Sequence, residues 1–146
     1  MITMRIKDSF FDRHVVMAAM GNARRKVLSK AGAFIRTTAK TSIRKRKKSA
    51  PPGSPPHSHE GSLRRLILFG YDRSSDSVLV GPVGFKKGTA PSVLEHGGDT
   101  VVLSRRGGRL RSRTVKIAPR PYMAPALDKE RPHLPLLWRN SIKKGE

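Results

Sequence analysis

Two histidines and a glutamate, spaced as His57-x-His59-Glu60, are the first side chains in this sequence whose types could do chemistry. Imidazole nitrogens and carboxylate oxygens are ligands of zinc and similar metals. These residues lie in a proline-rich stretch, without the helical i, i+4 spacing that turns two histidines toward one ion, and no further ligand is evident. We therefore predict no metal site and no cofactor, and we keep a hydrolase that uses these three residues as an alternative.

The adjacent pair Glu95 and His96 is a second candidate, because a carboxylate beside an imidazole could act as an acid–base pair. The sequence offers no third residue to orient the imidazole and no candidate nucleophile. We therefore predict a protein that is not an enzyme, with a structural or interface role for this pair.

Basic side chains gather in two runs that could contact a polyanion, Arg44–Lys48 (R-K-R-K-K) and Arg105–Arg113 (R-R-G-G-R-L-R-S-R). The first run equally suits a solvated helix end, because the negative end of the helix dipole favours cations there. Aromatic residues make up only 5% of the chain, so stacking platforms for single strands are scarce. Contact with duplex DNA would therefore be with phosphates, independent of base sequence and sensitive to salt. The predicted contact residues are Arg44, Lys45, Arg46, Lys47, Lys48, Arg105, Arg106, Arg109, Arg111 and Arg113.

Charge is distributed unevenly along the 146 residues, whose formal net charge is +21. Residues 1–50 carry 14 basic and 2 acidic side chains, residues 51–100 carry 5 of each, and residues 101–146 carry 12 basic and 3 acidic. Two basic regions around a neutral middle indicate a polyanionic neighbour, either nucleic acid or an acidic protein surface. The chain has no cysteine, no long apolar run and no apolar signal segment, so we expect a protein made in the cytoplasm that does not span a membrane.

The elements that must position these residues are predicted as a single α+β domain over residues 1–146. Apolar side chains at helical spacing predict a long helix over residues 9–45, with Ser9 as N-cap and Asp12 in the first turn. The glycines at 21 and 32 are expected to allow close approach of a packed partner. The predicted buried stripe is Val16, Met20, Ala23, Val27, Ala31, Phe34 and Thr38.

A proline-rich extended arm is predicted over residues 49–61, since its prolines cannot continue a helix. Alternating apolar residues predict β hairpins over residues 62–117, giving an antiparallel sheet of about four strands, with a short helix near residues 90–96. A C-terminal helical segment is predicted over residues 121–143, kinked near Arg131 by the prolines that follow. Its apolar face would be Leu134, Leu137, Trp138 and Ile142, with Tyr122 and Trp138 as core anchors.

Four short motifs, in order and spacing, resemble the tail-completion or head–tail joining (neck) proteins of tailed bacteriophages. The first motif enters the first strand through Gly61, Leu63, Arg64 and Ile67, and the second is V-L-V-G-P at Val78–Pro82. The third is V-L-E-H-G at Val93–Gly97, and the fourth is P-R-P-Y-M-A-P-A-L at Pro119–Leu127. The likeness covers about residues 9–142.

The resemblance implies a structural virion protein that forms a ring in the phage neck or tail, completes or terminates the tail and joins it to the head connector. It implies a homo-oligomer, a hexamer in first place and a dodecamer as alternative, with connector and tail proteins as neighbours and DNA in the channel. The basic runs would then contact DNA or an adjoining ring, and a free nucleic-acid-binding protein stays the alternative. The residues expected at contacts between subunits are Pro51, Pro52, Pro55, Pro56, Glu95, His96 and Gly97.

Overall fold

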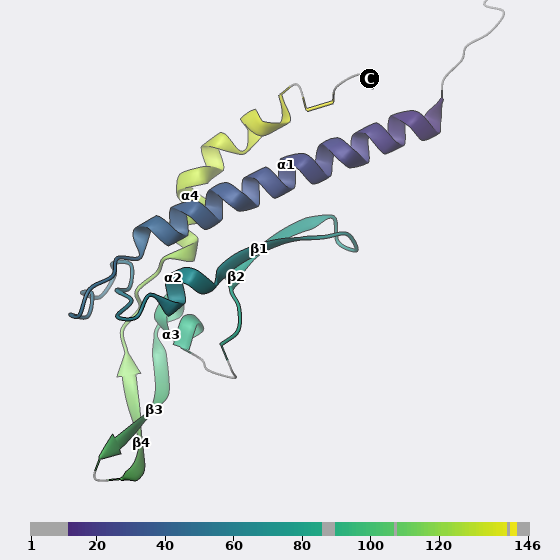
Figure 1. Ribbon diagram of the computed structural model, residues 1–146. Coiled ribbons are helices and arrows are strands. Elements are labelled where there is room, and N and C mark those ends of the chain that lie inside the picture. Colours follow the sequence, from purple (N-terminus) through teal and green to yellow (C-terminus); the bar gives the residue numbers. More distant parts are fainter. Residues whose placement is uncertain (1–11, 86–89, 107, 140, 143–146) are drawn as a thin grey trace, which may run out of the picture.

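The computed structural model describes residues 12–85, 90–106, 108–139 and 141–142 (Figure 1). The fold is α+β, with a long N-terminal helix, two antiparallel hairpins and a C-terminal helical segment, which confirms the predicted class. Its four strands form two separate two-stranded sheets where one sheet was expected. The predicted N-cap Ser9 lies outside the described residues, as do the side chains of Arg105 and Arg106.

Helix α1 spans Arg13–Ser42. Asp12 is its N-cap and not part of its first turn, because the carboxylate accepts hydrogen bonds from the amides of His14 (3.0 Å) and Val15 (3.2 Å). The helix ends before the predicted residue 45, since Ile43 takes an extended backbone (φ −82°, ψ 110°) and is buried.

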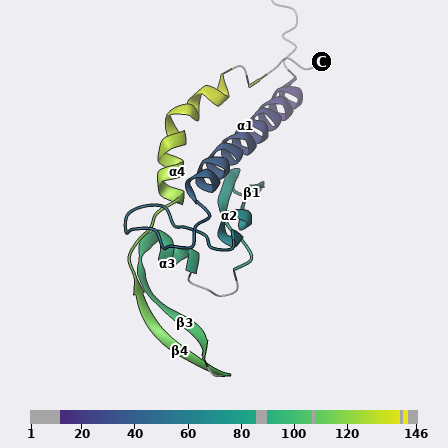
Figure 2. The ribbon, with the colours of Figure 1, turned by 60° about the vertical axis from the view of Figure 1, so that its left-hand side comes forward.

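The buried face of α1 differs from the predicted stripe. Val16, Met20 and Phe34 are each more than a third exposed. The first hairpin and the C-terminal helix cover the middle and the end of α1, so its first turns have little to pack against (Figures 1 and 2). The buried positions are Ala23, Val27, Ala31, Gly32, Ile35 and Ala39.

The first hairpin pairs β1 (Ile67–Asp72) with β2 (Ser77–Pro82) and lies along α1. It touches the helix at Gly32, where an added Cβ would lie 2.6 Å from Val78 Cγ2 and 3.0 Å from Phe69 Cδ2. The predicted close approach is therefore confirmed at Gly32. It is absent at Gly21, where no atom of the described residues lies within 4 Å of an added Cβ.

The second hairpin pairs β3 (Gly98–Arg106) with β4 (Arg109–Ile117) and projects from the body of the molecule, away from α1 (Figures 1 and 2). Its base contacts the short helix α3 (Ala90–His96), which was predicted. Among the described residues, no strand of one hairpin pairs with a strand of the other.

The core lies where the end of α1 meets a short helix, α2 (Ser62–Leu66), and the start of α4 (Met123–Glu130). Helix α2 was not predicted, because S-L-R-R-L reads as the entry to a strand. Tyr122 is 1% exposed, which confirms it as a core anchor. The buried core residues are Ala39, Ile43, Leu63, Ile67, Tyr122 and Ala126.

The C-terminal segment runs beside α1 and breaks where its prolines predict. Helix α4 is followed by two 3-10 turns, η1 (Arg131–His133) and η2 (Pro135–Trp138). Only part of the predicted apolar face packs, since Leu134 and Leu137 are half-buried while Trp138 is 46% exposed. The prediction that Trp138 anchors the core is wrong, because at that point the segment has only the sparsely covered first half of α1 beside it.

Candidate assembly interface and basic surface

The proline-rich loop, residues 49–61, folds back on its own chain and is not an extended arm. The amide of Gly53 donates to the Pro119 carbonyl (2.8 Å), and Nε of Arg120 donates to the Ala50 carbonyl (2.8 Å). Pro56 is fully buried, so it is not free to contact a neighbouring subunit. Pro51 and Pro52 are exposed and Pro55 is half-buried, so these three stay available for that role.

The first basic run follows directly on the C-cap of α1, Ile43, and leads into the proline-rich loop. Arg44 pairs with His57 in an isolated parallel bridge, and its carbonyl accepts a hydrogen bond from the Ser58 amide (3.0 Å). His57 Nδ1 lies 2.8 Å from the Lys48 carbonyl oxygen. The backbone of the run is thus fixed while all five of its cations are exposed, which suits contact with a polyanion.

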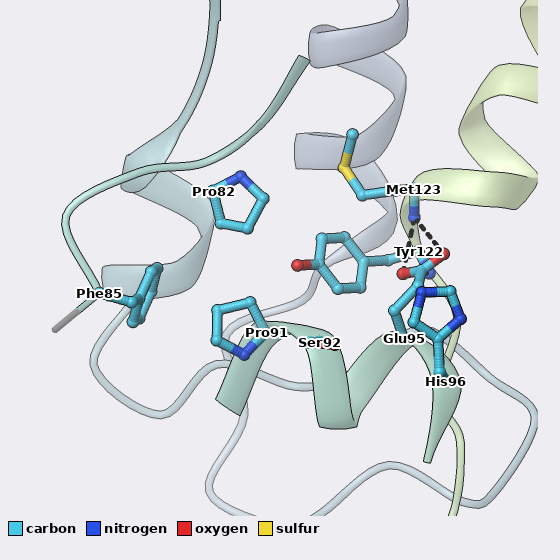
Figure 3. Close-up of a pocket in the computed structure, with 8 residues that line it drawn as sticks. All are labelled: Pro82, Phe85, Pro91, Ser92, Glu95, His96, Tyr122 and Met123. Atoms are coloured by element: carbon cyan, nitrogen blue, oxygen red, sulfur yellow. Dashed lines mark hydrogen bonds between the residues drawn. The ribbon is translucent and has the colours of Figure 1, made fainter. Parts of the chain in front are cut away.

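Glu95 joins two of the motifs that the sequence singled out (Figure 3). Its carboxylate accepts hydrogen bonds from the amides of Tyr122 (2.9 Å), Met123 (3.1 and 3.2 Å) and Ala124 (2.8 Å). These are the first amides of α4, which have no partner within a helix, and the carboxylate also suits the positive end of the helix dipole. Glu95 is therefore a cap within its own chain, and its contact with another subunit stays a prediction.

The corner after α3 is shaped by Gly97. Its φ of +77° favours glycine, and an added Cβ would lie 3.0 Å from Pro119 Cδ. The Gly97 amide donates to the Val93 carbonyl (2.8 Å), and the Arg120 amide donates to the Leu94 carbonyl (2.6 Å). This corner fixes the base of the second hairpin. Of the predicted contact residues here, His96 is exposed and Gly97 is half-buried.

A hollow of about 430 Å³ adjoins this corner. Figure 3 shows Phe85 and Tyr122 in its wall together with two prolines. Burial raises the pKa of Tyr122 to about 12, with the Glu95 carboxylate adding to the shift. Among the described residues that line the hollow, no hydrogen bond joins the Ser92 hydroxyl to His96 or Glu95. No three His, Cys, Asp or Glu side chains of the described part of the chain gather where they could hold a metal ion. The residues that line it are Pro82, Phe85, Pro91, Ser92, Glu95, His96, Tyr122 and Met123.

The second hairpin carries different chemistry on its two faces. In an antiparallel ladder the two residues of a pair lie on the same face of the hairpin, and successive pairs lie on opposite faces. The register Val102↔Arg113 and Ser104↔Arg111 therefore places Arg111 and Arg113 on one face, and Arg109, two residues before Arg111, lies on the same face. These three arginines define a basic face. Arg109, Arg111 and Arg113 are exposed, and none of them forms an ion pair within the described part of the chain.

The opposite face of the hairpin carries three uncovered apolar side chains among polar ones, a strip that sequence reasoning did not single out. Val101, Leu103 and Leu110 are 61, 68 and 71% exposed. Val101 lies opposite Thr114, and Leu103 opposite Ser112. The alternation of leucine with arginine in R-L-R-S-R was the signal that could have revealed it.

The tip of the first hairpin is fastened to α1 by polar contacts that the sequence did not reveal. Arg24 forms an ion pair with Asp76, which also accepts a hydrogen bond from the Tyr71 hydroxyl. These hydrogen bonds hold the pKa of Asp76 below its usual range. Hydrogen bonds from Ser75 and Ser74 lower the pKa of Asp72 to about 2. Both carboxylates therefore stay ionised, while Arg24 pairs with Asp76 and Arg73 lies in the same turn as Asp72.

A comparison of the chain with models of protein families, with curated proteins and with solved structures finds no match. Among the helices that the structure describes, none is both long and apolar enough to cross a membrane. The structure therefore defines an α+β protein whose second hairpin leaves apolar and basic side chains exposed.

Proposed function

We propose that this chain is a structural, non-enzymatic subunit of the neck or tail of a tailed bacteriophage. Copies form a ring, a hexamer in first place, that completes or terminates the tail, joins it to the head connector and leaves a channel for DNA. The chain would be made in the host cytoplasm and end in the virion.

The observation that carries this proposal is the projecting β3–β4 hairpin, which leaves an apolar face and a basic face uncovered on one element. A ring subunit around DNA needs both, since the apolar face suits a neighbouring protein and the arginines suit a polyanion. The resemblance of the four motifs to phage neck proteins supports the same assignment. Two of these motifs are in direct contact through Glu95 and the start of α4.

Immunolabelling of phage particles tests this proposal. Particles that encode the chain would be imaged by negative stain with an antibody against it, and particles of an unrelated phage would serve as control. Label at the head–tail junction is expected. Unlabelled particles, with the protein found only in extracts of infected cells, would overturn the assignment.

A second candidate is a sequence-independent nucleic-acid-binding protein. It is favoured by the exposed arginines of β4 and the exposed run Arg44–Lys48, which have no carboxylate partner in the described part of the chain. Such a protein would bind duplex DNA tightly as a monomer or dimer, and its affinity would fall steeply with salt. Binding of the isolated chain to unrelated duplexes over a salt series, combined with absence from virions, would favour this candidate.

A further inference from the structure

We propose that the apolar face of β3–β4 in one copy packs on the outer face of β1–β2 in the next copy, head to tail. This inference rests on the proposed function in one respect, that copies of the chain assemble. It adds which two surfaces of the copies meet and why they cannot meet within one chain.

The first surface is the strip formed by Val101, Leu103 and Leu110. All three side chains are more than half exposed on an isolated two-stranded hairpin. Such a hairpin is marginally stable in water unless something packs on it. Its nine-residue strands extend roughly 30 Å at about 3.4 Å per residue, long enough to reach a neighbouring subunit.

The second surface is the outer face of β1–β2, turned away from α1. Phe69 and Val78 face the helix, so Leu68 and Leu79 lie on the opposite face, where Leu79 is 67% exposed. Gly70 and Gly81 share this outer face. No described atom lies within 4 Å of a Cβ added to either glycine, so the surface between the two leucines is open. An open groove of about 440 Å³ lies here, lined by apolar side chains and glycine, among them Leu68, Gly70, Leu79, Gly81 and Val83.

The two surfaces cannot meet within one chain. The hydrogen bonds of Gly97 and Arg120 to α3, together with the Glu95 cap, fix the base of the second hairpin. From this base the hairpin projects away from β1–β2 in both views (Figures 1 and 2). The groove that receives the strip must therefore belong to another molecule.

Charge favours the head-to-tail contact over a contact between two β3–β4 hairpins. Residues 98–117 contain six basic and one acidic side chain, a net +5, whereas residues 67–82 contain one basic and two acidic side chains, a net −1. A contact between the β3–β4 hairpins of two copies would bring together two segments of net charge +5, which repel each other. The residues that line the apolar groove of the first hairpin include no cation to repel the strip.

A contact between two different surfaces leaves one donor strip and one acceptor groove on every copy. Such heterologous contacts generate a closed ring when the rotation between copies closes. The basic face stays uncovered because it lies opposite the buried strip. The same hairpin can therefore hold the ring together and present arginines to DNA.

Site-directed crosslinking tests this contact, and the chain suits it because it has no cysteine. The single variants Leu103→Cys and Leu79→Cys are prepared separately, mixed, and treated with a short bismaleimide crosslinker. Both residues are exposed, so both variants should fold. The mixture is expected to give a crosslinked dimer and each variant alone none, while the double variant should give a ladder that ends at the ring size. Arg111→Cys, on the opposite face of the hairpin, mixed with Leu79→Cys is the matched control and should not crosslink.

The size of the assemblies, measured on the same samples by native mass spectrometry, separates the two possible failures. Rings without a crosslink between positions 103 and 79, or crosslinking of Leu103→Cys with itself, would overturn this contact and leave the proposed function standing. A chain that stays monomeric at every concentration, without crosslinks, would overturn both.

Discussion

Glu95 accepts hydrogen bonds from three amides that begin α4, across 27 to 29 residues of sequence. Glu95→Ala leaves these amides without a protein acceptor, and we expect it to lower the free energy of unfolding by about 1–3 kcal/mol. Glu95→Gln keeps one carbonyl oxygen and should cost less. Urea unfolding monitored by circular dichroism measures both. Glu60→Ala is the control, because Glu60 is exposed and forms no hydrogen bond or ion pair with the described residues; an equal effect of Glu60→Ala and Glu95→Ala would show that Glu95 is no cap.

The two helix glycines make a matched pair. Gly32→Ala gains about 1 kcal/mol of helix propensity but places a methyl group against the stiff side chain of Val78, and overpacking of this kind costs about 1–3 kcal/mol. Gly21→Ala gains the same propensity with open space around it. We expect thermal unfolding to show that Gly21→Ala is stabilised and Gly32→Ala destabilised. If both variants were stabilised, the hairpin would not pack on α1 at Gly32.

Tyr122 makes the fold sensitive to alkali. Burial raises its pKa from 10.0 to about 12, so the folded state favours the neutral phenol. This contribution to stability is complete below about pH 10 and is lost as pH rises toward 12. In a Tyr71→Phe background Tyr122 is the remaining tyrosine, and its tyrosinate absorbance should titrate near 12 in the folded chain and near 10 in urea. A folded-state midpoint near 10 would contradict the burial of this ring.

The basic face of β4 is expected to contact phosphates, because its three arginines are exposed on one face of a projecting strand and form no ion pair within the described residues. Replacing Arg109, Arg111 and Arg113 by Gln should reduce the salt dependence of duplex binding. The slope of log K against log salt becomes shallower by roughly 0.9 for each phosphate that the protein no longer neutralises, so by up to about three in this variant. Fluorescence anisotropy with two unrelated duplexes measures the slope.

The control for this experiment removes three exposed cations from the C-terminal segment, Lys129, Arg131 and Arg139. It matches the change in net charge but spares the hairpin. Equal slopes for the two triple variants would mean that overall charge, and not the arginine face, governs binding.

The elements that have a strong local pattern could be predicted from the sequence. The period of α1, the alternation in the four strands and the glycine after α3 all act over a few residues, and each gave an element close to the observed one. Helix α2 could not be predicted, because five residues carry too little periodicity. The division into two sheets could not either, since alternation identifies strands but not their partners.

The candidate surfaces were predicted in part for the same reason. The arginines of β4 lie close together in the sequence, so the basic surface that they form could be predicted without knowing the fold. The cap by Glu95 and the burial of Pro56 depend on contacts between distant segments, and no local pattern announces them. The apolar strip on β3–β4 was overlooked because alternating strands are read with one face buried, whereas here both faces are exposed.

The net charge of +21 on every copy sets how the molecule as a whole assembles. Repulsion between whole copies far exceeds the local attraction between a +5 hairpin and a −1 hairpin, so low salt should oppose ring formation. The screening length shrinks from about 30 Å at 0.01 M to about 10 Å at 0.1 M, while an apolar contact does not weaken over this range.

We therefore expect sodium chloride to promote rings and to weaken DNA binding in the same preparation. Light scattering coupled to size-exclusion chromatography, at fixed protein concentration over a salt series, measures the ring fraction, and anisotropy on the same samples measures DNA affinity. Opposite trends follow if an apolar strip holds the copies and arginines hold the DNA, because screening removes repulsion in the first case and attraction in the second. Leu103→Glu is the control: it should abolish the rise in rings and leave most of the salt dependence of DNA binding. Rings that dissolved as salt rose would mean that ion pairs join the copies, and the apolar strip would then need another partner.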